Sequence, residues 1–291
     1  MKKILYTALI LFAATSMVAA QTTEEVKSIT KHEFSVSAFG GLQSLQYDVE
    51  NGSVSSSFGG GGGIGYFFNF NSKWSIGTGV DFAYYASSYE IPTMNGTYKN
   101  NGITFNYTVT GYEETQSALM LEIPVLARFS LGLGESQKSA LQFTAGVKFG
   151  FPMSASFTAS AAGHKTNTAK DEYVGVDYNF DEILAPNSPQ AVAKQSGDFD
   201  ASMSIQALAE IGYRMPIGEK NGLYFGAYFT YGLNDMQKTK DGELITYDTS
   251  IPVVTNEPPK HIYNGSILNT KDASSIRPMG FGLKMRFSFG L

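Results

Sequence analysis

The sequence lacks cysteine, has little charge and has few long apolar runs. Without cysteine, the 291-residue chain can form neither disulfides nor thiolate metal sites. Charged residues make up only 16% of the chain. After residue 20, no apolar stretch reaches the roughly 20 residues that a membrane-spanning helix needs. These features exclude a helical-bundle membrane protein and a disulfide-stapled secreted domain.

The abundant residues favour a β-barrel. The chain has 31 glycines, 17 tyrosines and 21 phenylalanines, which is unusual for a soluble enzyme. Its mean hydropathy is close to zero. A transmembrane barrel has this average because its polar lumen and loops dilute the apolar band that faces lipid.

The N-terminus predicts export. Lys2 and Lys3 precede an apolar run at 4–14, and small residues stand at Val18 and Ala20. This pattern is typical of a secretory signal peptide, 1–20, cleaved after Ala20. An N-terminal membrane anchor is the alternative, although the run is short for one. A short periplasmic segment, 21–32, and a barrel domain, 33–291, would then form the mature chain.

Eight segments of the predicted mature chain alternate apolar and polar residues, which is the period of a β-strand with two unlike faces. In the last segment, for example, Phe287 and Phe289 lie on one face and Arg286 and Ser288 on the other. The eight segments are 33–47, 60–71, 74–89, 117–131, 140–157, 202–217, 223–233 and 279–291.

The connections between these segments alternate in length. Those at 71–73, 132–139 and 218–222 are short, whereas the others are long excursions: 48–59, 90–116, 158–201 and 234–278. Short turns on one side and long loops on the other are expected of outer-membrane barrels. The fold class is therefore all-β, an eight-stranded antiparallel up-and-down transmembrane β-barrel in the cell outer membrane, with both termini periplasmic.

The composition of the two faces indicates which one points outward. A soluble lipocalin-type barrel would place the apolar face inside. The polar face here is small and nearly uncharged, as at Gly61, Gly63 and Gly65, whereas a solvent face would be rich in Lys and Glu. The apolar face carries bulky residues. We therefore expect the apolar face to meet lipid.

The segment Leu121-Glu-Ile-Pro-Val-Leu-Ala-Arg-Phe129, with the signal peptide and the eight strands, resembles the outer-membrane β-barrel family of Bacteroidetes, which includes PorT-like proteins. It is more distantly similar to the OmpA transmembrane domain and OmpX. The resemblance implies a barrel placed by the barrel assembly machinery. It also makes a secretion-assisting role an alternative function.

Charged residues on the polar face predict a lumen network. Glu122 and Lys148 are the expected ion pair at mid-depth, above a cluster of arginines near the carboxylate of Leu291. Buried charges require such partners. The predicted members are Asp81, Glu122, Arg128, Lys148, Glu210, Arg214, Lys284 and Arg286.

The sequence contains few residues in arrangements that indicate catalysis. A lipid-modifying enzyme needs a histidine near a serine and a carboxylate, and His164 offers only a weak match. Metal binding between loop histidines is less favoured still. We predict a non-enzymatic protein without cofactor or metal. A lipid-modifying enzyme and a secreted ligand-binding barrel are the alternatives.

The long loops carry an excess of acidic residues, which disfavours nucleic acid as a partner. Ile103, Phe105, Tyr107 and Val109 share parity with Leu119, so we expect this strand to continue beyond the membrane. It would pair with 84–91 around a turn at 94–96. The expected partners are outer-membrane lipid and lipopolysaccharide, with an extracellular protein bound through the loops. We expect a monomer.

Overall fold

The computed structural model describes residues 30–49, 52–100, 102–134, 139–171, 177–179, 190–242, 244, 246–247, 261–262 and 265–291. The chain divides into two units, Met1–Thr30 and Lys31–Leu291, and the second contains the fold. The predicted signal peptide and most of the segment 21–32 lie outside the described residues. Among those residues, no helix is long and apolar enough to cross a membrane.

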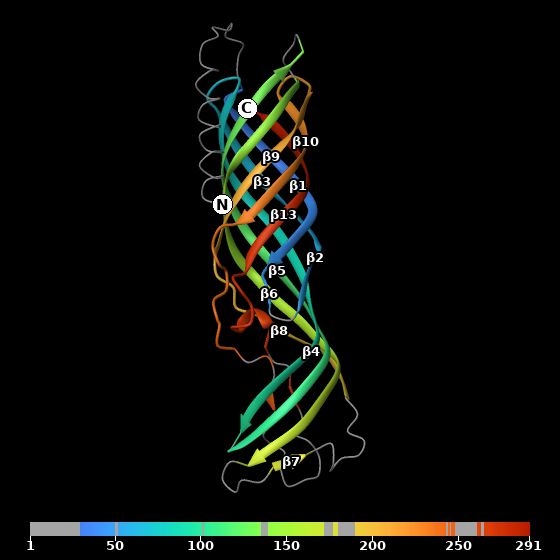
Figure 1. The fold of residues 1–291 in the computed structure, drawn as a ribbon. Coiled ribbons are helices and arrows are strands. Elements are labelled where there is room, and N and C mark those ends of the chain that lie inside the picture. The colour runs from blue at the N-terminus through green and yellow to red at the C-terminus, as the bar shows by residue number, and fades with distance from the viewer. Residues whose placement is uncertain are drawn as a thin grey trace, which may run out of the picture. The chain divides into compact units, whose positions relative to one another are not determined.

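Eight antiparallel strands close into a ring, which confirms the predicted fold class. Each strand pairs with the ring strand that follows it in the chain, and the last pairs with the first (Figure 1). The ring consists of β1 (His32–Gln46), β3 (Phe58–Asn69), β4 (Trp74–Asn100), β5 (Ile103–Leu133), β6 (Ser139–Asp171), β9 (Ser204–Ile217), β10 (Asn221–Gly232) and β13 (Arg277–Gly290).

Smaller elements lie in the long connections. Three short strands pair with the long strands of the ring: β2 (Ser53–Ser56) with β4, and β7 (Asp177–Asn179) and β8 (Gln190–Asp198) with β6. The connection between β10 and β13 contains the pair β11 (Thr246–Tyr247) and β12 (His261–Ile262), and the 3-10 helix η1 (Ile267–Asn269).

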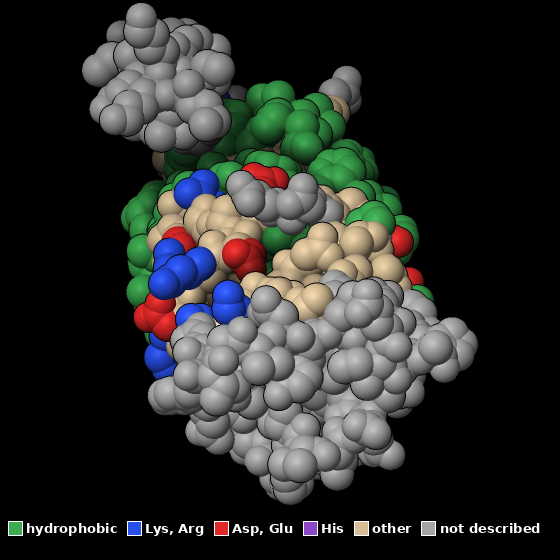
Figure 2. Space-filling view, turned by 60° about the horizontal axis from the view of Figure 1, so that its bottom comes forward, with side chains coloured by type: hydrophobic (Ala, Val, Ile, Leu, Met, Phe, Trp, Pro, Cys, Tyr) green, Lys and Arg blue, Asp and Glu red, His purple; other side chains and the backbone are tan. Residues whose placement is uncertain are grey.

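The exterior of the ring is apolar and its interior is polar. Leu283 is 74% exposed and Phe82 is 50% exposed, whereas Glu122 and Lys148 are buried. Figure 2 shows hydrophobic side chains along the flank of the barrel and charged side chains towards the end that comes forward. This distribution is the reverse of a lipocalin-type barrel. The predicted outward direction of the apolar face is confirmed.

Strands β4, β5 and β6 are far longer than predicted, with 27, 31 and 33 residues. Much of the expected loops 90–116 and 158–201 is therefore strand. The reason is that the three strands pair with one another beyond the ring and so satisfy their backbone groups. In Figure 1 they extend together from one end of the barrel, called here the long-strand end.

The predicted turn at 94–96 is wrong. Asn95 lies within β4 opposite Thr108, and the hairpin reverses between Asn100 and Ile103. Gly102 has φ 78° there, a left-handed conformation that glycine adopts without strain. The segment 84–91 pairs with 112–119 rather than with 103–109.

The burial pattern along β5 changes at Gly111, which has φ +58°. From Tyr112 towards the ring the even-numbered residues are buried, whereas Val109 and Phe105 are buried beyond it. Val109 belongs to the same apolar cluster as Tyr112 despite its opposite parity. Continuation of the strand is confirmed, but these odd-numbered residues are buried, unlike the exposed Leu119.

Candidate functional site: the lumen and the barrel mouth

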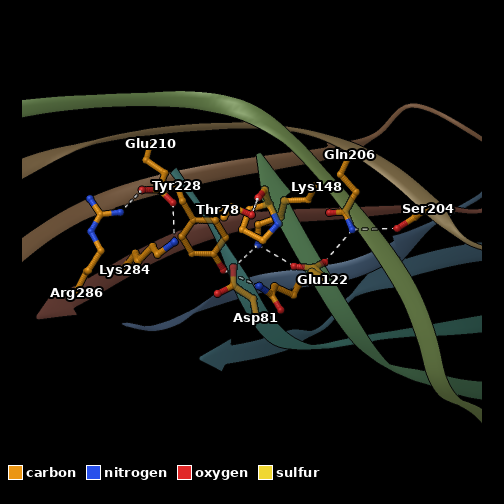
Figure 3. Close-up of polar contacts among 12 residues, drawn as sticks. Thr78, Asp81, Glu122, Lys148, Ser204, Gln206, Glu210, Tyr228, Lys284 and Arg286 are labelled. Carbon is orange, nitrogen blue, oxygen red and sulfur yellow. Dashed lines mark hydrogen bonds and ion pairs between the residues drawn. The ribbon is translucent and has the colours of Figure 1, made fainter. Parts of the chain in front are cut away.

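Three charged side chains meet at mid-depth in the lumen. Lys148 Nζ lies 2.7 Å from Glu122 Oε2 and 3.1 Å from Asp81 Oδ2 (Figure 3). Asp81 and Glu122 are direct cross-strand neighbours, where like charges repel, and Lys148 offsets that repulsion. Tyr85 Oη and Gln206 Nε2 donate to Glu122 Oε1 at 2.7 Å and 2.8 Å. Both oxygens of this buried carboxylate therefore have partners.

A second group is centred on Glu210. Its Oε1 lies 2.7 Å from Lys284 Nζ and its Oε2 lies 3.4 Å from Arg286 Nη1 (Figure 3). The ring of Phe39 connects the two groups, because Lys148 Nζ and Lys284 Nζ lie 5.0 Å and 5.7 Å from its centroid. Both distances are within the range of cation–π attraction.

Arg128 lies closer to the short-turn end of the barrel. It donates two hydrogen bonds to Glu33, at 2.7 Å and 3.2 Å, and its guanidinium lies 4.0 Å from the ring centroid of Phe67. The carboxylate that pairs with Arg128 is that of Glu33, a residue outside the predicted network. Glu33 was missed because it stands at the start of a strand, although its odd number on β1 places it on the inward face.

Two further arginines lie in this layer. The Arg286 guanidinium lies 4.4 Å from the ring centroid of Tyr224 and 5.2 Å from that of Phe67. Arg214 lies beside Gly222, where a Cβ would come within 2.5 Å of its Nε. Any larger residue at 222 would therefore displace this guanidinium.

The structure brings the predicted network residues into one interior. Seven of the eight are buried and Arg214 is half-buried. A cavity beside Lys148 and Arg286 has a volume of about 20 Å³, which is enough for roughly one water molecule. A second, more open cavity of about 420 Å³ is lined by Phe39 and Lys284 together with the exposed Leu283 and Met285 of the outer face.

The barrel mouth at the long-strand end holds a site that the sequence did not indicate. Glu114 accepts hydrogen bonds from Ser266 Oγ, from the Ile267 backbone N–H at 3.0 Å, from Tyr112 Oη at 2.6 Å and from Gln116 Nε2 at 3.0 Å. Burial raises the pKa of the Glu114 carboxyl above its usual range, although these hydrogen bonds act to lower it.

The segment held by Glu114 covers the mouth with apolar side chains. Ile267 and Leu268 of η1 are buried, and they join Met236 and Ile276 in one cluster with Tyr85 of the lumen wall. The described residues of 235–276, called here the mouth cap, lie within the connection 234–278, which was predicted to be a long loop. No alternation of apolar and polar residues marks them, so nothing in the sequence indicated that they cover the mouth.

Of the three histidines, His32 is the one whose side chain lies within the described part of the chain. His32 Nδ1 lies 2.8 Å from Tyr66 Oη at the short-turn end, and the side chains of His164 and His261 lie outside those described. Within the described part of the chain, no group of three or more His, Asp or Glu residues could hold a metal ion.

A closed antiparallel ring with an apolar exterior and an ion-paired interior defines a transmembrane β-barrel. Residues 19–238 match the family described as outer membrane protein beta-barrel domain. The chain belongs to this family, and its location is the outer membrane.

Three solved structures show a distant similarity to the chain. OprG from Pseudomonas aeruginosa has 8% identity and a TM-score of 0.37, covering 90% of this chain and 97% of OprG. Neisserial surface protein A has 10% identity and a TM-score of 0.31, with coverages of 88% and 94%. The attachment invasion locus protein Ail of Yersinia pestis has 11% identity and a TM-score of 0.27, with coverages of 89% and 99%. No curated protein matches the chain.

Proposed function

We propose that the protein is a non-enzymatic outer-membrane barrel with a closed lumen that presents a binding surface outside the cell. The observation that carries the proposal is the set of ion pairs buried in the lumen. Glu122 pairs there with Lys148, and Glu210 pairs with Lys284. Because an eight-stranded barrel is only wide enough for its own side chains, solute flow would require these pairs to separate.

The strand lengths support an orientation. A tilted transmembrane strand needs roughly 9–11 residues, and β5 has 31. About 20 residues of such a strand extend beyond the hydrocarbon core. Barrels of this class place their short turns in the periplasm. We therefore assign the long-strand end to the cell exterior, and the start of β1 and the end of β13 to the periplasm. Lipopolysaccharide would then contact the outward face of the barrel wall at the depth of the outer leaflet.

Permeability tests the closed lumen. The refolded protein is reconstituted in vesicles, and uptake of a small sugar is measured against protein-free vesicles and against vesicles containing a general porin. We expect uptake equal to that of protein-free vesicles. Uptake that approaches the porin control would overturn the proposal.

A gene deletion tests the absence of enzymatic activity and the surface role. Lipid A mass spectra of deleted and complemented cells should be identical, because His32, the histidine whose side chain is described, lies beside Tyr66 rather than beside a serine and a carboxylate. Attachment of the cells to coated surfaces should fall on deletion. Loss of a secreted protein from the medium, with attachment unchanged, would instead favour the alternative, secretion-assisting role.

A further inference from the structure

The sheet that extends beyond the ring has a regular polar face. Thr97 Oγ1 donates to Asn106 Oδ1 at 3.1 Å, and Asn106 Nδ2 donates to Thr168 Oγ1 at 2.8 Å. Next to this row, Thr108 Oγ1 donates to Asn95 Oδ1 at 2.7 Å. These side chains come from β4, β5 and β6, so the hydrogen bonds run across all three strands.

The strand register places further residues on this polar face, on either side of the hydrogen-bonded row. Thr93 lies opposite Thr110, and Lys99 lies opposite Thr104, which in turn lies opposite Lys170 on β6. Cross-strand neighbours share a face, and residues two apart repeat roughly every 6.8 Å along a strand. The result is a grid, called here the Thr/Asn array: Thr93, Asn95, Thr97, Lys99, Thr104, Asn106, Thr108, Thr110, Thr168 and Lys170.

The two faces of this sheet differ in exposure. Phe105 and Val109 on the other face are buried, and Met94 and Tyr107 pack against the apolar cluster. On the array, Thr93, Asn95, Thr97, Asn106 and both lysines are exposed to solvent. The array is therefore the face that a ligand can reach.

We propose that the Thr/Asn array binds an acidic polysaccharide, an inference that rests on the proposed exterior placement of this sheet. Hydroxyl and amide groups supply both donors and acceptors, which suits the repeated hydroxyls of a sugar chain. Lys99 and Lys170, on either side of Thr104, supply positive charge for its carboxylate or sulfate groups. In the adjoining strand β7, Asp177 lies opposite Lys170 and Asn179 lies opposite Thr168. The same face therefore also carries one acidic residue, and Lys99, Lys170 and Asp177 together have a net charge of +1.

Composition argues against a protein partner at this face. Protein interfaces depend on a few buried aromatic or arginine anchors, and none stands among the described array residues. The internal hydrogen bonds also fix the rotamers of Asn95 and Asn106 in advance. Pre-ordered side chains lose less entropy on binding, which benefits a ligand held mainly by hydrogen bonds.

The test measures binding by the full-length protein in nanodiscs to polygalacturonate, alginate and chondroitin sulfate, with neutral dextran as the comparison. At least one acidic polysaccharide should bind and dextran should not. The double variant Asn95→Ala/Asn106→Ala should bind roughly fivefold or more weakly, because each lost hydrogen bond weakens binding several-fold. Thr115→Ala is the matched control, since Thr115 is exposed on β5 outside the array.

The contribution of the two lysines is measured separately, through the salt dependence of binding. Lys99→Gln/Lys170→Gln should weaken binding and reduce its dependence on salt, because screening acts on charge pairs. The inference is overturned if none of the three acidic polysaccharides binds, if dextran binds equally well, or if the asparagine variant binds like Thr115→Ala.

A deletion separates this inference from the proposed function. Removal of 93–110 joins Pro92 to Gly111, a dipeptide that favours a turn, and leaves the pair Ile91–Tyr112 beside it. If this deletion abolishes cell attachment while the array variants do not, the surface role stands and the partner is not a glycan. If solute flows through reconstituted wild type, the proposed function fails whatever the result of the glycan measurement.

Discussion

Two buried carboxylates on the same strand are stabilised in different ways. Glu122 of the lumen pairs with Lys148 of the neighbouring strand, so its partner belongs to the barrel wall. Glu114 of the mouth, eight residues away, is held by neutral donors, two of which belong to the mouth cap. The wall supplies the charge that compensates Glu122, whereas Glu114 depends on a connecting segment that must fold onto it.

The largest effect should come from removing the cation of the lumen. Lys148→Met leaves Asp81 and Glu122 facing each other without a positive charge. Breaking a buried ion pair from one side costs about 3–5 kcal/mol. The barrel should unfold at a markedly lower temperature, measured by heat-modifiable migration on a gel.

Glu122→Gln is the milder comparison, because Lys148 then keeps Asp81 as its partner. It should lower the unfolding temperature by less than Lys148→Met does. If both variants unfold at the wild-type temperature, the ion pairs do not stabilise the wall.

Shortening a buried side chain of the mouth cap should destabilise the cap but not the barrel. Leu268→Ala removes a fully buried side chain of η1, and such truncations cost about 2–5 kcal/mol. Because the ring strands pair independently of the cap, proteolysis within 235–276 should accelerate while the unfolding temperature of the barrel stays nearly constant. A fall as large as that of Lys148→Met would show that the two regions unfold together.

Replacing Phe39, whose ring lies near both lysines of the lumen, should have a smaller effect on the unfolding temperature. Phe39→Leu keeps an apolar side chain but removes the ring that lies near Lys148 and Lys284. Cation–π contacts contribute about 0.5–2 kcal/mol. A modest decrease in unfolding temperature is expected, and Phe39→Tyr, which keeps the ring, should restore most of it if its hydroxyl is accommodated.

The smallest effect is a pH dependence of the mouth. The pKa of Glu114 is raised in the folded state by burial, so the folded cap binds more protons than the open one. Its stability is therefore greatest at low pH and falls as pH rises through the folded-state pKa. Proteolysis of the cap, corrected for protease activity, should increase from pH 5 to pH 8, and Glu114→Gln should reduce this increase.

Period-two alternation was sufficient to predict the ring and the inward direction of its charges, because lipid and lumen impose opposite requirements on successive residues. It could not reveal where β4, β5 and β6 end. Beyond the membrane the sheet has a polar array on one face and Phe105 and Val109 on the other, in a segment whose composition resembles a loop. Two of the four residues that donate hydrogen bonds to Glu114, Ser266 and Ile267, lie more than 150 positions away in the sequence, a distance that no local pattern spans.

The pairing of β1 with β13 has a consequence for assembly. The two strands are joined along 14 residue pairs, yet they lie at opposite ends of the ring sequence. Until β13 arrives, β1 and β10 both expose unpaired backbone edges, which lipid cannot satisfy. The wall is closed only when β13 has paired with β1 on one side and with β10 on the other. Any factor that shields these edges beforehand must leave when the seam between β1 and β13 forms.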